Sequence, residues 1–259
     1  LNSRCFRNQY SFVNFYIPET SQIILGLLSG ATFSYGLFWF FQSLRLFESS
    51  RVVPAIGGIT PLFTFGLIYI VSSGKESLSF FEVVSFILLI LGSVLITLKK
   101  EKEITLKSLG FSALAAFFIS LSFVLTKYVF LAQPFWNGFI WKSLGGFLIA
   151  PCFFVLFPEI RKEIFKKKER FSQKITFLFI ANQALGSGAA ILQNYAIFLA
   201  PLAYIPVVDA LNGTQYVFLL ILAILFSLKF PQLFKEEISK EIILQKAFAV
   251  LFIVAGLAL

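Results

Sequence analysis

The chain contains no histidine and no methionine among its 259 residues, and only 13 acidic residues against 22 lysines and arginines. Histidine is the commonest general base and the commonest transition-metal ligand, so its absence excludes histidine-based catalysis. Only two cysteines occur, Cys5 and Cys152, and neither belongs to a CxxC pair or another metal-type spacing. We therefore expect no metal ion and no cofactor.

Charged residues are also scarce, at 14% of the chain, whereas 58% of the residues are hydrophobic. Soluble domains are about 45 to 50% apolar. The 35 phenylalanines and the long leucine and isoleucine runs exceed what the core of one soluble fold of this length would hold. The sequence therefore predicts an integral membrane protein, whose principal partner is the lipid bilayer.

Clusters of charged residues, together with prolines and glycines, divide the chain into apolar segments of roughly 20 residues, the length that a spanning helix needs. These runs are continuous and do not alternate, so they predict helices instead of the strands of a barrel. We predict an all-α, multi-pass helical bundle of about eight transmembrane helices, at 22–44, 52–71, 80–98, 108–130, 136–157, 175–199, 202–228 and 242–259.

The basic residues divide unevenly between the two sides of this bundle. Sixteen of them fall on one side, and seven of these lie between residues 158 and 174. The positive-inside rule makes that side cytoplasmic and places Lys75 and both ends of the chain outside. The basic residues do not form a stripe interleaved with aromatics, so we expect no nucleic-acid partner and a location in the plasma membrane.

Features of the first half recur in the same order in the second half. FFQSLRLFESSRVVPAIGGITPLFTFGLIYI, from Phe40, aligns with NYAIFLAPLAYIPVVDALNGTQYVFLLILAI, from Asn194, and each is followed by a polar loop and an apolar segment bearing glycine. The first three segments therefore pair with the last three, while two segments have no partner upstream. We expect two further helices before Leu1, where the chain shows neither methionine nor a signal-peptide pattern.

This arrangement resembles the EamA-type transporters of the drug/metabolite transporter superfamily. The resemblance rests on FFQSLRLFESS, VVPAIGGITPLF, the turn with Lys75 and Glu76, SFVLTKYVF and QPFWNGFIWKSLGGFLI. It implies ten helices in two inverted five-helix repeats, with 1–98 as the remainder of the first, 99–107 as a basic linker and 108–259 as the second. The insert PQLFKEEISK departs from the family, as do external chain ends. The resemblance also implies a small-molecule substrate and leaves a homodimer open.

Polar residues inside the apolar segments are the candidate substrate-binding residues, because a charge in hydrocarbon costs about 2.5 to 3.5 kcal/mol and usually faces a cavity or the bundle interior. Asp209, Asn212 and Tyr216 follow i, i+3, i+7 spacing and share one helix face, with Gln215 about 120° from Asp209. Asp209 is the candidate proton carrier. Hydrogen bonding between helices without any ligand is the alternative.

Other segments add polar and hinge candidates. The segment 175–199 contains NQALGSGAAILQNY, whose small residues are expected to let helices approach closely. Lys142 would attract an anionic group, whereas Lys127 is expected to reach the interface by snorkelling. The predicted substrate-binding residues are Gln42, Thr60, Asn182, Gln183, Asn194, Asp209, Asn212, Gln215 and Lys142. The predicted hinge, or a purely structural kink, comprises Pro54, Gly57, Gly58 and Pro61.

These features favour a secondary transporter of small organic solutes that works by alternating access, and not an enzyme. No Walker motif occurs, so ATP hydrolysis by this chain is not expected. An intramembrane enzyme acting on lipid would need a nucleophile or metal constellation, and the chain has no G-x-S-x-G motif. A non-transporting membrane scaffold or subunit derived from a transporter is the alternative function.

Overall fold

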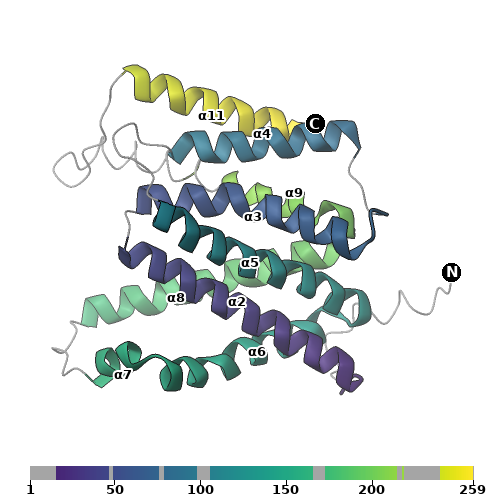
Figure 1. Cartoon of the computed structure of the whole chain (residues 1–259), viewed down its shortest axis with the longest axis vertical. Helices are drawn as coiled ribbons and strands as arrows, with labels where there is room; N and C mark the ends of the chain where they lie inside the picture. The colour runs from purple at the N-terminus through teal and green to yellow at the C-terminus, as the bar shows by residue number, and fades with distance from the viewer. Residues whose placement is uncertain are drawn as a thin grey trace. The chain divides into compact units, whose positions relative to one another are not determined.

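The computed structural model describes residues 16–46, 49–75, 79–97, 106–165, 173–214, 218 and 240–258, and within these ranges it is helical and has no strand. The helices are α2 (Thr20–Leu46), α3 (Ser49–Val71), α4 (Phe80–Thr97), α5 (Leu106–Ala132), α6 (Phe135–Leu156), α7 (Pro158–Phe165), α8 (Gln173–Leu199), α9 (Ile205–Ala210) and α11 (Lys240–Ala258) (Figure 1). Two 3-10 turns, η1 (Leu202–Tyr204) and η2 (Leu211–Gly213), flank α9.

Four of the described helices are long and apolar enough to cross a membrane: Thr20–Leu46, Gly110–Ala132, Phe135–Leu156 and Gln173–Leu199. Shorter apolar helices cover Ile56–Val71 and Phe80–Gly92. Large apolar side chains such as Phe147 and Leu185 remain exposed on them, which water would disfavour and lipid accepts. The chain is a helical membrane protein.

Two stretches differ from the predicted segments. The region 158–174, predicted as a loop, begins with α7, because Pro158 occupies the first helical position, where a missing N–H costs nothing, and Arg and Lys are good helix formers. The segment 202–228, predicted as one helix, is divided into η1, α9 and η2 over its first part. Most of its remainder, including Gln215, lies outside the described residues.

The chain packs as two compact units. Unit 1 comprises Leu1–Ser34 and Leu125–Ala200, and unit 2 comprises Tyr35–Val124 and Pro201–Leu259, so α2 and α5 each contribute to both. This division follows packing and does not address internal repeats. The repeat boundaries at 1–98, 99–107 and 108–259, and the ten-helix pattern, stay predictions.

In unit 2, α11 lies alongside α4, and α4 also contacts α3 and α9 (Figure 1). Glycines permit the close contact between α4 and α11: a Cβ at Gly92 would lie 2.6 Å from the Ile253 side chain, and one at Gly256 would lie 2.9 Å from Leu89. The Ser85 hydroxyl donates a 2.5 Å hydrogen bond to the Gly256 carbonyl across the same contact. Small residues and polar bonds of this kind join helices in lipid, where apolar burial drives little association.

In unit 1, α2 and α6 cross with their backbones in direct contact. A Cβ at Gly30 would lie 1.8 Å from the Lys142 carbonyl oxygen, and one at Gly145 would lie 2.1 Å from the Leu27 carbonyl oxygen. Both neighbours are backbone atoms that cannot swing aside, so the crossing requires glycine at both positions. The crossing fixes the backbone of Lys142 directly against α2.

Candidate functional site

A buried carboxylate lies in unit 2. Asp209, in α9, is 6% exposed. The Thr64 hydroxyl lies 2.9 Å from its Oδ2, and the Asn212 amide donates to its Oδ1 over 3.3 Å. Both partners are neutral side chains, so Asp209 is held by hydrogen bonds from α3 and from the turn that follows α9.

Hydrogen bonds extend from this carboxylate through α3 to α5. The Thr64 hydroxyl also lies 3.0 Å from the Thr60 carbonyl oxygen, and the Ser120 hydroxyl donates to that same carbonyl over 2.8 Å. The Thr60 hydroxyl is engaged by the Ile56 carbonyl at 2.7 Å. Asp209 therefore belongs to a buried polar network that joins α9, α3 and α5.

The local backbone explains why Asp209 lies on a short helix. Pro201 precedes η1 and Pro206 occupies the start of α9, where each proline restricts the chain and removes a donor. The Tyr204 hydroxyl donates to the Glu82 carboxylate, which also accepts from the Ser79 backbone N–H at 2.7 Å in a capping box that begins α4. The start of α9 is thereby tied to the start of α4.

A second buried polar group lies in unit 1. Lys142, on α6, is 7% exposed, and its Nζ donates a 2.7 Å hydrogen bond to Asn194 Oδ1 on α8. The same Nζ lies 5.3 Å from the ring centroid of Phe33 on α2, within the range of a cation–π contact. Asn194 Nδ2 donates back to the Ala190 carbonyl at 2.7 Å. Residues from α2, α6 and α8 therefore converge on one ammonium group.

The structure brings together some of the predicted residues within each unit. Thr60, Asp209 and Asn212 belong to the network of unit 2, and Lys142 and Asn194 form the pair in unit 1. Gln42 is half-buried on α2, but no described bond links it to either group, and Asn182 and Gln183 are exposed on α8.

The predicted hinge lies on α3, which continues unbroken through Pro54 and Pro61. Gly58 and Pro61 are buried, and Gly57 is half-buried. Pro61 removes the donor that would bond the Gly57 carbonyl within the helix, which weakens the helical hydrogen bonding about one turn before Thr60 and about two turns before Thr64. A hinge at this position stays a prediction.

The expectation that the glycines of α8 let helices approach closely is wrong. A Cβ added at Gly186 or Gly188 would meet no atom within 4 Å, so these glycines do not mediate close packing in the described structure. The buried residues of α8 are Asn194 and Ile197, near its end.

The expectation that Lys127, on α5, reaches the membrane interface by snorkelling is also wrong. Lys127 is 4% exposed, and its Nζ donates to the carbonyls of Ile197 at 3.3 Å and Phe198 at 3.0 Å.

Sequence reasoning missed two residues of the network around Asp209, Thr64 and Ser120, and it missed the bonding partners of Lys127. Thr64 follows Thr60 by four residues and so shares its helix face, a signal that was available in the sequence. Ser120 and Lys127 bond to backbone carbonyls 60 and 71 residues away, and no local pattern identifies such partners.

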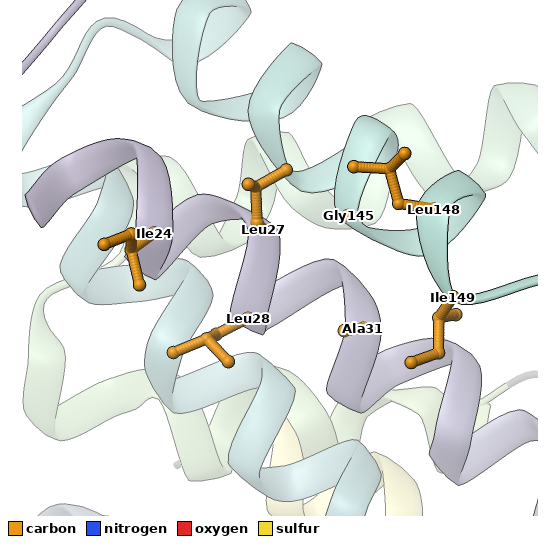
Figure 2. Close-up of a pocket in the computed structure, with 7 residues that line it drawn as sticks. All are labelled: Ile24, Leu27, Leu28, Ala31, Gly145, Leu148 and Ile149. Atoms are coloured by element: carbon orange, nitrogen blue, oxygen red, sulfur yellow. The ribbon is translucent and has the colours of Figure 1, made fainter. Parts of the chain in front are cut away.

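A pocket of about 240 Å³ opens between α2 and α6 in unit 1, and Figure 2 shows the aliphatic side chains around it. It is lined by Ile24, Leu27, Leu28, Ala31, Gly145, Leu148 and Ile149. None of these residues offers a polar side chain, so the pocket suits hydrocarbon and not a polar solute.

No family model matches the sequence, and no curated protein matches it. The fold resembles that of a solved structure reported as "Crystal structure of protein", with a TM-score of 0.64 and 16% identity, covering 98% of this chain and 79% of that chain. At this identity the likeness shows the fold alone: this helical arrangement exists in an experimentally determined protein.

Proposed function

We propose that the chain is a secondary transporter of small organic solutes, of the EamA type within the drug/metabolite transporter superfamily, which works by alternating access in the membrane. The observation that carries this proposal is Asp209, a buried carboxylate bonded only to neutral partners, Thr64 and Asn212, among the described residues. Because an acidic group inside a membrane bundle is costly to insert, such groups mark ion and substrate pathways.

The 3-10 turns on either side of α9 support the same function. A stretch of 3-10 geometry next to an α-helix often marks a functional hinge, and η1 and η2 flank the helix that bears Asp209. In contrast, a residue that served only to join helices would not need a charge. The packing alternative explains a single amide more easily than this carboxylate.

The bonds of Thr64 suggest how a proton on Asp209 would act on α3. Thr64 has one hydroxyl hydrogen but two acceptors within reach, Asp209 Oδ2 at 2.9 Å and the Thr60 carbonyl at 3.0 Å. When Asp209 is ionised, Thr64 donates to it. When Asp209 is protonated, its own O–H donates to Thr64, whose hydrogen then turns to the Thr60 carbonyl, one residue before Pro61. Protonation would thus change the hydrogen bonding of α3 at its proline.

The test is uptake by the full chain reconstituted in liposomes, with labelled amino acids, sugars and monocarboxylates as probes and protein-free liposomes as the blank. We expect Asp209→Asn to reduce uptake about tenfold or more, the equivalent of losing one hydrogen bond to a charged group. We also expect it to remove the dependence of uptake on an imposed proton gradient. Glu19→Gln makes the same chemical change at an exposed carboxylate and should leave uptake unchanged.

Thermal unfolding of each variant in detergent separates transport from folding. If Asp209→Asn lowers the unfolding temperature and uptake together, the network is structural and the transport assignment loses its support. A chain that moves none of the probes in any gradient would favour a membrane scaffold instead.

A further inference from the structure

We propose that Lys142 and Asn194 bind the carboxylate of a small organic anion, which makes monocarboxylates the substrate class. As a statement about transport, this inference rests on the proposed function; as a statement about binding, it stands on the geometry of unit 1. Three observations carry it: the donors that remain unused, the charge that remains unbalanced, and the fixed position of Lys142.

The Lys142 ammonium group has N–H donors that bond to no acceptor among the described residues. Its contacts are the 2.7 Å bond to Asn194 Oδ1 and the ring of Phe33, so within the described structure two of its three N–H groups have no acceptor. The Asn194 amide uses one N–H on the Ala190 carbonyl and keeps a second. Three N–H groups on neighbouring side chains match the acceptor-only oxygens of a carboxylate.

The charge of the site is also unbalanced. Asn194 and Phe33 are both neutral, and no described carboxylate contacts Lys142, although a buried cation is strongly destabilised when it lacks a counter-charge. One cation balances one negative charge. A carboxylate satisfies this count, whereas a phosphate monoester carries a charge of about −1.5 to −2 and would leave a buried excess.

The position of Lys142 suits a substrate site more than an interfacial anchor. It lies seven residues after the start of α6, about 10 Å along the helix at 1.5 Å per residue. The Gly30 contact fixes its backbone against α2, and the side chain extends to Phe33 and Asn194. Because Lys142 is buried in this structure, a ligand reaches it only when the helices move apart, as alternating access requires.

The test measures thermal unfolding of the full chain in detergent with matched pairs of probes: isobutyrate against isobutyramide, and benzoate against benzamide. A ligand that binds the folded state raises the unfolding temperature, so we expect the acids to raise it more than their neutral amides. Lys142→Gln should weaken acid binding by about 30-fold or more, because it removes one partner of a buried charge pair. Lys174→Gln, which removes an exposed charge from the start of α8, should leave the shift intact.

Asn194→Asp keeps the inference testable even if Lys142→Gln does not fold. It places a carboxylate within bonding distance of Lys142, so the free protein should unfold at a higher temperature and the shift caused by added acids should disappear. The inference is overturned if acids and amides shift the wild type equally, or if Asn194→Asp still responds to acids as the wild type does.

Uptake by proteoliposomes separates this inference from the proposed function. Acids that bind at Lys142 but do not enter liposomes would contradict transport and leave the binding site standing. Uptake of a neutral solute that Lys142→Gln does not change would support transport and contradict the assignment of monocarboxylates as the substrate class.

Discussion

Lys127 shows how one buried charge stabilises the end of a neighbouring helix. Its ammonium donates to the carbonyls of Ile197 and Phe198, in the last turn of α8. The last carbonyls of a helix have no donor within the helix, and they lie at the negative end of its dipole. A buried cation at this position donates hydrogen bonds to these carbonyls and offsets the partial negative charge at the end of the helix.

We expect Lys127→Met to destabilise the protein by about 1 to 3 kcal/mol, because methionine keeps the apolar stem but leaves two carbonyls without their donor. The measurement is thermal unfolding of the purified chain in detergent. Lys174→Met is the matched control: it removes an exposed charge from the opposite end of α8, where a cation does not favour the dipole. Equal unfolding temperatures for the two variants would contradict the capping role.

The residues that the sequence could identify are those whose partners lie on the same helix face. Asp209 and Asn212 are three residues apart, and their spacing indicates the contact that the structure contains. Asn182 and Gln183 follow an equally regular pattern, yet both are exposed. Periodicity identifies residues that share a face, but what covers that face depends on contacts between segments distant in the sequence.

At the scale of helices, the sequence predicted positions well and packing poorly. For α5, the predicted bounds 108–130 agree to within two residues with the observed Leu106–Ala132. They agree because the length of an apolar run is a local property of the sequence, limited by the charged residues at its ends. The 3-10 turns on either side of α9 were not predicted, since hydropathy does not distinguish 3-10 from α-helical geometry. Pro201 and Pro206 were the available signals.

The crossing of α2 and α6 is the packing feature most sensitive to a single atom. Gly30→Ala would place a methyl group 1.8 Å from the Lys142 carbonyl oxygen, and only separation of the two helices relieves that clash. We expect a loss of at least about 1 to 3 kcal/mol in the free energy of unfolding, measured by thermal unfolding in detergent.

Gly186→Ala is the control for this change. It adds the same methyl group on α8, where no atom lies within 4 Å, so the higher helix propensity of alanine should leave stability equal or raised by about 0.5 to 1 kcal/mol. If both variants were equally stable, the close approach of α2 and α6 would be wrong.

At the scale of the whole molecule, the number of membrane crossings decides which ends of the helices face the cytoplasm. Between Lys75, after α3, and Lys162, on α7, the described residues form the three long helices α4, α5 and α6. The shortest of them, α4, has 18 residues and is about 27 Å long, close to the roughly 30 Å of a hydrocarbon core. Although α4 is not among the four helices named above as long and apolar enough to cross, we expect it to cross together with α5 and α6. Three crossings would put Lys75 and Lys162 on opposite sides.

We expect the side that bears the basic residues around α7 to be cytoplasmic, because positively charged segments are retained in the cytoplasm. In a variant without Cys5 and Cys152, we therefore expect a cysteine at Lys75→Cys to react with a membrane-impermeant thiol reagent added to intact cells, and one at Lys162→Cys to react only after the membrane is permeabilised. Both positions are exposed, so burial does not account for a difference between them. The reverse pattern would invert the topology. Reaction of both cysteines from outside would mean that α4 does not cross the membrane, so that only two crossings separate Lys75 from Lys162. The pairing of the first three helices with the last three as an inverted repeat would then lose its basis.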